Sequence, residues 1–212
     1  MSRVLILTTG GTIGALPVER IDRMPHFKTM PPEGDVVAEA LKVDFKEWDT
    51  RCVSLEPRDS NFIDAPYREN LARLIEESEE QRVILTHGTD TILDTAAFFY
   101  ERRKGHPSYT GKPIILTGAM VPLANGTFSD GYQNIAFSLQ QLCSLSVPPP
   151  PLSLVLCGYE RLAVFEGAWA PRLYPFKPNL YQRYYDAKDP LKDGLAPYGY
   201  PEGREPILRE NL

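Results

Sequence analysis

The sequence lacks any long apolar run. Its apolar segments have the length of single β-strands, far below the roughly 18 to 20 residues that cross a bilayer. The run that follows Arg3 is also too short for the core of a signal peptide, and no small-residue cleavage site comes after it. We therefore expect a protein that is neither embedded in a membrane nor exported, and that works in the cytoplasm.

Clusters of basic residues are missing as well. The chain of 212 residues holds 23 Lys and Arg against 28 Asp and Glu, which gives a formal net charge of -5. An acidic protein without a basic stripe has no electrostatic attraction for phosphate backbones or anionic lipid. We expect it to bind neither nucleic acid nor membranes.

Cysteines are few and show no pairing pattern. Cys52, Cys143 and Cys157 are odd in number and lack both a CxxC and a Cys/His ligand spacing. This pattern indicates neither a disulfide framework nor a zinc site. We expect free, mostly buried thiols and no metal.

What the sequence does contain is an alternation of short apolar runs with helical patterns. Strands are predicted at residues 3–8, 51–55, 82–86, 113–117 and 152–156, and helices at 65–78, 91–103 and 129–142. Asp64 and Pro66 are typical of a helix start. The third and fourth strands are apolar throughout, as in strands covered on both faces. The pattern predicts an α/β fold, a doubly wound, mostly parallel sheet with helices on both faces.

The pattern changes at Tyr174. Residues 174–212 hold six prolines and six tyrosines and show almost no aliphatic periodicity. We therefore divide the chain into an α/β domain at 1–173 and an irregular Pro/Tyr-rich C-terminal tail at 174–212. Tyrosine offers apolar area with a polar tip, which favours a tail that packs on the domain or on a neighbouring subunit. Free disorder is the alternative.

The loop after the first strand is the first candidate for a ligand site, because open α/β sheets bind ligands at the carboxyl ends of their strands. Residues 8–14 read TTGGTIG. The glycines at 10 and 11 let backbone N–H groups approach a ligand beside the hydroxyl of Thr12. Dinucleotide binding is the alternative, but the segment lacks both the GxGxxG spacing and a P-loop lysine.

The loop after the third strand is the second candidate, and reads THGTDT at residues 86–91. A simpler explanation is that Thr89 or Asp90 caps the next helix, and that role is compatible with a role in binding. Small or short polar side chains also follow the second and fourth strands: Asp59, Ser60, Asn61, Gly118 and Ala119. Together the four loops predict a polar crevice lined by small residues.

The TTGGTIG and THGTDT segments resemble the two signature segments of the bacterial-type L-asparaginase and glutaminase family. The similarity extends to residues 59–61, 115–122 and 129–131 and to Asn134, so it covers about residues 3–172. It implies the fold of that family's N-terminal domain and hydrolysis of a side-chain amide, such as that of L-asparagine, to the acid and ammonia. It implies no metal or cofactor.

The resemblance also implies roles for individual residues. Thr12 would be the nucleophile that attacks the amide carbon. Thr89 would contact the reacting end of the substrate, and Asp90 would hold its α-amino group. A threonine hydroxyl is weak at neutral pH, so the chemistry needs a nearby base and N–H groups that stabilise the oxyanion. The glycine turn at residues 10–11 and the N–H of Thr89 are the candidates for the oxyanion.

The remaining residues of the predicted site would bind the substrate. Ser60, with Asp59, would take the α-carboxylate or α-amino end, and the backbone at Ala119 would face the leaving amide. The predicted substrate-binding set is Gly11, Asp59, Ser60, Gly88 and Ala119.

Three features depart from the family's pattern. If Glu166 and Gly167 are aligned with its acidic-glycine pair, Arg172 stands where the family has a lysine that hydrogen-bonds the second threonine. A guanidinium stays protonated, so Arg172 would pair with Asp90 but could not accept a proton. In the family, a lid that follows the first motif carries a tyrosine that assists the nucleophile. The corresponding residues 15–32 contain no tyrosine. His26 lies in this segment and is either a substitute base or an exposed bystander. Third, we expect this protein to lack the family's smaller C-terminal domain, which helps to pair subunits.

The departures leave other functions open beside an asparaginase-like amidohydrolase. One is a catalytically impaired amino-acid-binding or regulatory module. Another is hydrolysis of a different amide or ester, including the role of an amidotransferase-type partner that supplies ammonia. In each case we expect a small-molecule amino-acid amide or its analogue as ligand, and a homodimer or higher homo-oligomer.

Overall fold

The structure is a computed structural model that describes residues 3–17, 27–28, 36–105, 112–124, 129–144, 151–156, 162–164 and 208–209. All five predicted strands are present, and each observed end lies within one residue of the prediction. They are β1 (Val4–Thr8), β4 (Thr50–Ser54), β5 (Val83–Thr86), β6 (Ile114–Thr117) and β7 (Leu152–Val155).

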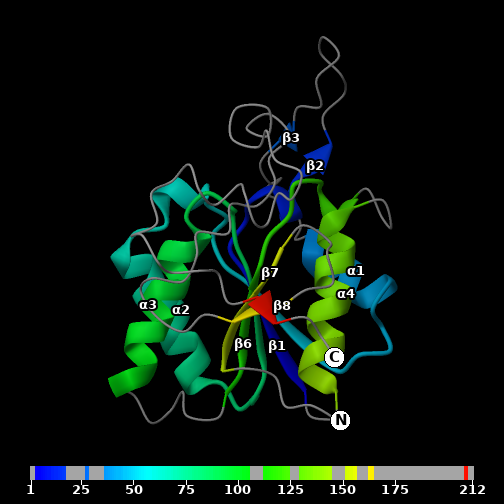
Figure 1. The fold of residues 1–212 in the computed structure, drawn as a ribbon. Coiled ribbons are helices and arrows are strands. Elements are labelled where there is room, and N and C mark those ends of the chain that lie inside the picture. Colours follow the sequence, from blue (N-terminus) through cyan, green and yellow to red (C-terminus); the bar gives the residue numbers. More distant parts are fainter. Residues whose placement is uncertain are drawn as a thin grey trace.

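These five strands are parallel and lie in the order β4-β1-β5-β6-β7. Two short antiparallel strands, β8 (Leu162–Val164) and β9 (Leu208–Arg209), extend the sheet beyond β7. A separate pair, β2 (Leu16–Pro17) with β3 (Phe27–Lys28), lies above the carboxyl ends of the parallel strands in Figure 1. Apart from β9, the predicted C-terminal tail lies outside the described residues.

Helices cover both faces of the sheet, which confirms the predicted doubly wound α/β fold (Figure 1). One face carries α2 (Ala65–Glu77) and α3 (Ile92–Gly105), and the other carries α1 (Val36–Val43) and α4 (Asp130–Cys143). None of the helices in the described ranges is both long and apolar enough to cross a bilayer.

The sheet separates two apolar cores because successive strand residues point to opposite faces. Leu5 and Leu7 of β1 pack with Leu71 of α2 and Phe99 of α3. Val4 and Ile6 pack in the core that α1 and α4 complete. Every residue of β5 and β6 is buried, as their uninterrupted apolar sequences predict.

The start of α2 follows the predicted signal. The side chain of Asp64 accepts a hydrogen bond from the Tyr67 N–H, with Pro66 in the first turn of α2. Ser129 caps α4 in the same way, through the Tyr132 N–H.

Of the cysteines, Cys52 is half-buried, Cys143 is buried and both are free, while Cys157 lies outside the described residues.

Candidate active site

Gly11 and Gly88 bring the loops after β1 and β5 into backbone contact. A Cβ placed on Gly11 would lie 2.7 Å from the Cα of Gly88 and 2.8 Å from its nitrogen. Gly11 also has a φ of 78°, a conformation that residues with a side chain rarely adopt. The two motifs therefore meet at a position that only glycine can occupy.

The loops after β4 and β6 join this contact. A Cβ on Gly88 would lie 2.8 Å from the Cβ and 2.9 Å from the Oγ of Ser60. A Cβ on Gly118 would lie 2.6 Å from the carbonyl oxygen of His87 and 2.8 Å from the Cγ2 of Thr89. Four loops at the carboxyl edge of the sheet thus converge on one small region.

Thr12 begins a short 3-10 turn, η1 (Thr12–Gly14), directly after Gly11. The Gly14 N–H donates to the Gly11 carbonyl at 3.2 Å, and the Ala15 N–H to the Thr12 carbonyl at 3.0 Å. Ile13 is fully buried and Thr12 is half-buried. The core therefore anchors the turn through Ile13, while its first residue keeps access to solvent.

Two carboxylates are joined by one amide at the edge of this region. The Asn61 Nδ2 donates to the Asp59 Oδ1 at 2.9 Å and to the Asp90 Oδ2 at 3.4 Å. Asp59 also accepts from the Asn61 N–H, which caps the short helix η2 (Ser60–Phe62). Two carboxylates this close create a negative potential that suits an ammonium group.

Hydrogen bonds to backbone carbonyls hold η2 and the segment before it against their neighbours. The Thr91 hydroxyl donates to the Ser60 carbonyl at 2.6 Å, which ties η2 to the start of α3. The Arg58 N–H donates to the Thr9 carbonyl at 2.8 Å, which ties the preceding segment to the end of β1. Ser60 itself is buried, and only 3% of its surface is exposed.

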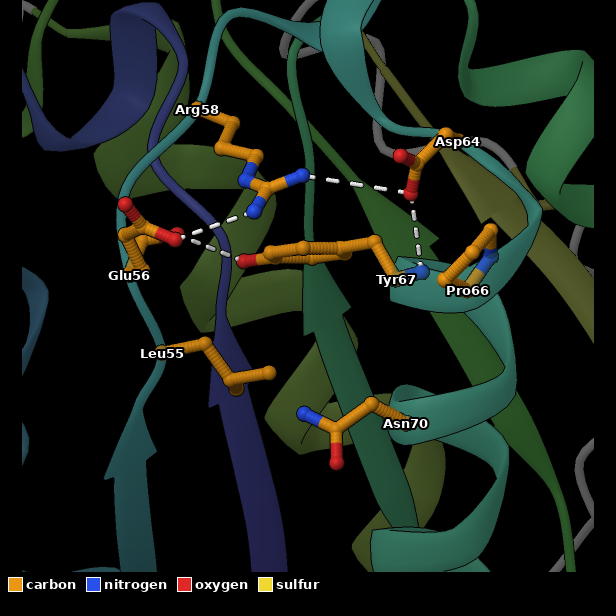
Figure 2. Close-up of a pocket in the computed structure, with 7 residues that line it drawn as sticks. All are labelled: Leu55, Glu56, Arg58, Asp64, Pro66, Tyr67 and Asn70. Carbon is orange, nitrogen blue, oxygen red and sulfur yellow. Dashed lines mark hydrogen bonds and ion pairs between the residues drawn. The ribbon is translucent and has the colours of Figure 1, made fainter.

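A pocket of about 320 Å³ lies between the segment after β4 and the start of α2 (Figure 2). Inside it, the Arg58 guanidinium bonds Glu56 at 3.0 Å, lies 3.8 Å from Asp64 and stands 4.8 Å from the centre of the Tyr67 ring. The Tyr67 hydroxyl donates to the Glu56 carbonyl at 2.7 Å, and burial raises the pKa of Tyr67 to about 12. None of the predicted site residues that the structure describes lines this pocket. The bonds among Glu56, Arg58, Asp64 and Tyr67 brace the segment that leads to Asp59.

The N-terminal end of α4 fixes the loop after β6. The Asp130 carboxylate accepts from the backbone N–H groups of Met120, at 2.9 Å, and Val121, at 2.8 Å. The Asn134 side chain donates to the Gly118 carbonyl at 2.8 Å. Burial raises the pKa of Asp130, although the N–H bonds oppose that shift. Ala119, between these anchors, is buried.

The model of a known family, described as "Asparaginase, N-terminal", matches residues 3–161. The chain belongs to the asparaginase family. Members of this family are typically amidohydrolases.

The asparaginase-family fold is also found in a solved structure, "The thermostable L-asparaginase from Thermococcus kodakarensis". The TM-score is 0.54 at 20% sequence identity, and the match covers 76% of this chain and 45% of the other. This member of the asparaginase family therefore spans less than half of the structure that it matches. At this identity the likeness concerns the fold.

Most of the predicted residues lie in or beside the contacts described above. Gly11, Gly88, Ser60 and Thr89 take part in the close approaches of the loops, and Asn61 joins Asp59 to Asp90. Thr12 and Ala119 directly follow Gly11 and Gly118 in the sequence. Arg172 and His26 lie outside the described residues.

Asn61, Asp130 and Asn134 were given no individual role by the sequence, although Asn61 was placed in the predicted crevice and the other two lie in segments that resemble the family. Asn61 follows Asp59 and Ser60 directly, and its position beside them was the available signal. Asp130 and Asn134 stand four residues apart at a helix start, and therefore share one face of α4. What they bond was not visible in the sequence.

Proposed function

We propose that this protein hydrolyses the side-chain amide of L-asparagine, or of a close analogue, to the acid and ammonia. The observation that carries the proposal is the contact between Gly11 and Gly88, because it sets the segment of Thr12 against the segment of Thr89. Membership of the asparaginase family supports the reaction class.

The Thr12 hydroxyl oxygen is the nucleophile in this proposal. It forms a bond to the amide carbon as its proton passes to a base, and the carbonyl oxygen takes up the negative charge. The C–N bond then breaks as the nitrogen gains a proton and leaves as ammonia. Water hydrolyses the resulting Thr12 ester, which releases the acid and restores the hydroxyl.

Backbone and side-chain groups around Thr12 supply binding and charge stabilisation. The N–H groups of the turn at residues 10–11 and of Thr89 are the proposed donors to the oxyanion. Asp59 and Asp90, linked by Asn61, are the proposed partners of the substrate ammonium. Arg172, which is placed from the sequence alone, is proposed to pair with Asp90. We also propose that the chain acts as a homo-oligomer.

Ammonia release from asparagine, glutamine and a small panel of amides tests the proposal. Thr12→Ala and Thr89→Val should each abolish release. Thr50→Ala is the matched control. Thr50 is also half-buried, but it is the first residue of β4 and so lies at the amino ends of the strands, away from the site at their carboxyl ends. It should leave the rate unchanged.

Two outcomes would refute the hydrolase. The first is Thr12→Ala turnover equal to that of wild type. The second is a wild-type protein that aspartate stabilises against heat but that releases no ammonia. The second result would favour an amino-acid-binding module.

A further inference from the structure

His87 is the most deeply buried titratable group near the site, and the proposed reaction does not use it. Its surface is 0% exposed, and both of its ring nitrogens are engaged. We propose that Arg68, Thr95 and His87 form a hydrogen-bond chain that positions the peptide between Gly88 and Thr89 for catalysis. This inference rests on the proposed amide hydrolysis and makes His87 a positioning residue.

The hydrogen-bond chain runs from α2 through α3 to the loop after β5. The Arg68 Nε lies 3.1 Å from the Thr95 Oγ1, which lies 2.9 Å from the His87 Nε2. The His87 Nδ1 lies 2.6 Å from the Gly88 carbonyl oxygen. Three side chains from separate elements thus connect the half-buried Arg68 to the backbone at the site.

Which group donates in each hydrogen bond follows from the two ends of this hydrogen-bond chain, Arg68 and Gly88. The Arg68 Nε can only donate, and the Gly88 carbonyl can only accept. Thr95 therefore accepts from Arg68 and gives its single proton to the His87 Nε2, so the His87 Nδ1 must carry the ring proton. The bonds select one tautomer of a neutral imidazole.

A second property of the ring agrees with this assignment. Burial, with a smaller contribution from the positive charge of Arg68, lowers the pKa of His87 to about 4, although the bond to Gly88 opposes the shift. The ring is then neutral at pH 7. Because Thr95 occupies its only lone pair, His87 is not available as a base for Thr12.

The bond at the Gly88 carbonyl has a consequence for the next residue. In a trans peptide the carbonyl and the following N–H point in opposite directions. When His87 holds the Gly88 oxygen, it also sets the direction of the Thr89 N–H, a proposed oxyanion donor. The backbone of His87 is fixed as well, since its N–H donates to the Thr117 carbonyl at 2.8 Å.

Thr95→Val tests the chain because it removes the hydroxyl and keeps the shape of the side chain. We expect kcat for ammonia release to fall about 10- to 100-fold with little change in KM, less than the about 100- to 1,000-fold loss when an oxyanion donor is deleted. Thr95→Ser keeps the hydroxyl and should restore most of the rate. Arg68→Met should give a smaller loss.

Ser153→Ala is the control for deleting a buried hydroxyl. Ser153 is 0% exposed on β7, and its Oγ has no hydrogen-bond partner within the described part of the chain. Its variant should keep kcat. Circular dichroism of each variant checks that it is folded.

Nitrogen-15 NMR of the histidine rings gives a readout independent of turnover. Wild type should show His87 protonated at Nδ1 alone from pH 6 to pH 9, and Thr95→Val should shift the Nε2 resonance, because that nitrogen loses its hydrogen-bond donor. A ring protonated at Nε2, or one that titrates near pH 6.5, would overturn the proposal. So would an unchanged kcat in folded Thr95→Val. If wild type released no ammonia, the proposed function would fail, while the ring tautomer would still decide whether the chain of bonds exists.

Discussion

Replacement of Gly11 by alanine should destabilise the protein through two separate costs. Gly11 has φ 78° and ψ -178°, a region that is essentially restricted to glycine and costs other residues about 1 to 3 kcal/mol. The added methyl would also lie 2.7 Å from the Gly88 Cα, and such overpacking against backbone costs about 1 to 3 kcal/mol more. The free energy of unfolding should fall by about 2 to 6 kcal/mol.

Denaturant unfolding followed by circular dichroism measures this loss. For a domain of this size, each kcal/mol lowers Tm by about 2 to 4 °C, so Tm should fall by roughly 4 to 24 °C. Ammonia release, measured where the variant is still folded, should fall as well, because the segment of Thr12 has to move away from Gly88.

Gly105→Ala is the matched control. An added Cβ at this end of α3 meets nothing within 4 Å, and alanine is the better helix former. The free energy of unfolding should change by no more than about 1 kcal/mol, in the stabilising direction. If Gly11→Ala and Gly105→Ala had the same stability, the proposed contact between the two motif segments would be wrong.

Three further predictions concern stability. Lys112→Met should lower the free energy of unfolding by about 1 to 3 kcal/mol, because the buried Lys112 ammonium donates to two carbonyls at the end of α2, at 2.9 and 2.8 Å. Chemical denaturation measures the loss, and an unchanged midpoint would contradict it. Thr86→Val should raise the free energy of unfolding by about 1 kcal/mol, because the buried Thr86 Oγ1 has no hydrogen-bond partner among the described residues. A drop in Tm would oppose that reasoning. The depressed pKa of His87, about 4 against the ordinary 6.5, stabilises the fold above pH 6.5, and this contribution of about 3 kcal/mol is lost as pH falls towards 4. His87→Gln should therefore lose less stability than wild type between pH 7 and pH 4, and parallel pH profiles would refute the assignment.

The regular elements could be predicted because their signals are local. The strands β5 and β6 are short, uninterrupted apolar runs, and Asp64 marks the start of α2 as its N-cap. The helix α1 was missed. It has eight residues, begins with two valines and buries only Val37 and Leu41, too few positions for a helical period to stand out. Its packing on the sheet decides its structure.

The candidate site could be predicted in outline for a similar reason. Its motifs follow strands that the apolar runs had already located, so the loops could be assigned to one edge of the sheet. The hydrogen bonds between the loops could not be predicted, because no pattern in the sequence indicates them. Nothing near Asn61 in the sequence indicates Asp90, and nothing near Asp130 indicates that it holds the backbone of Met120.

The amino-acid sequence alone determined the strands, most of the helices and the position of the two motif segments, because apolar periodicity, helix caps and motifs are properties of neighbouring residues. Only the tertiary structure decided that Gly11 contacts Gly88, that one amide joins Asp59 to Asp90, and that the buried His87 ring lies between Thr95 and the Gly88 carbonyl. These features depend on the strand order β4-β1-β5-β6. That order is set by how distant segments bury their apolar faces together, and no local pattern encodes it.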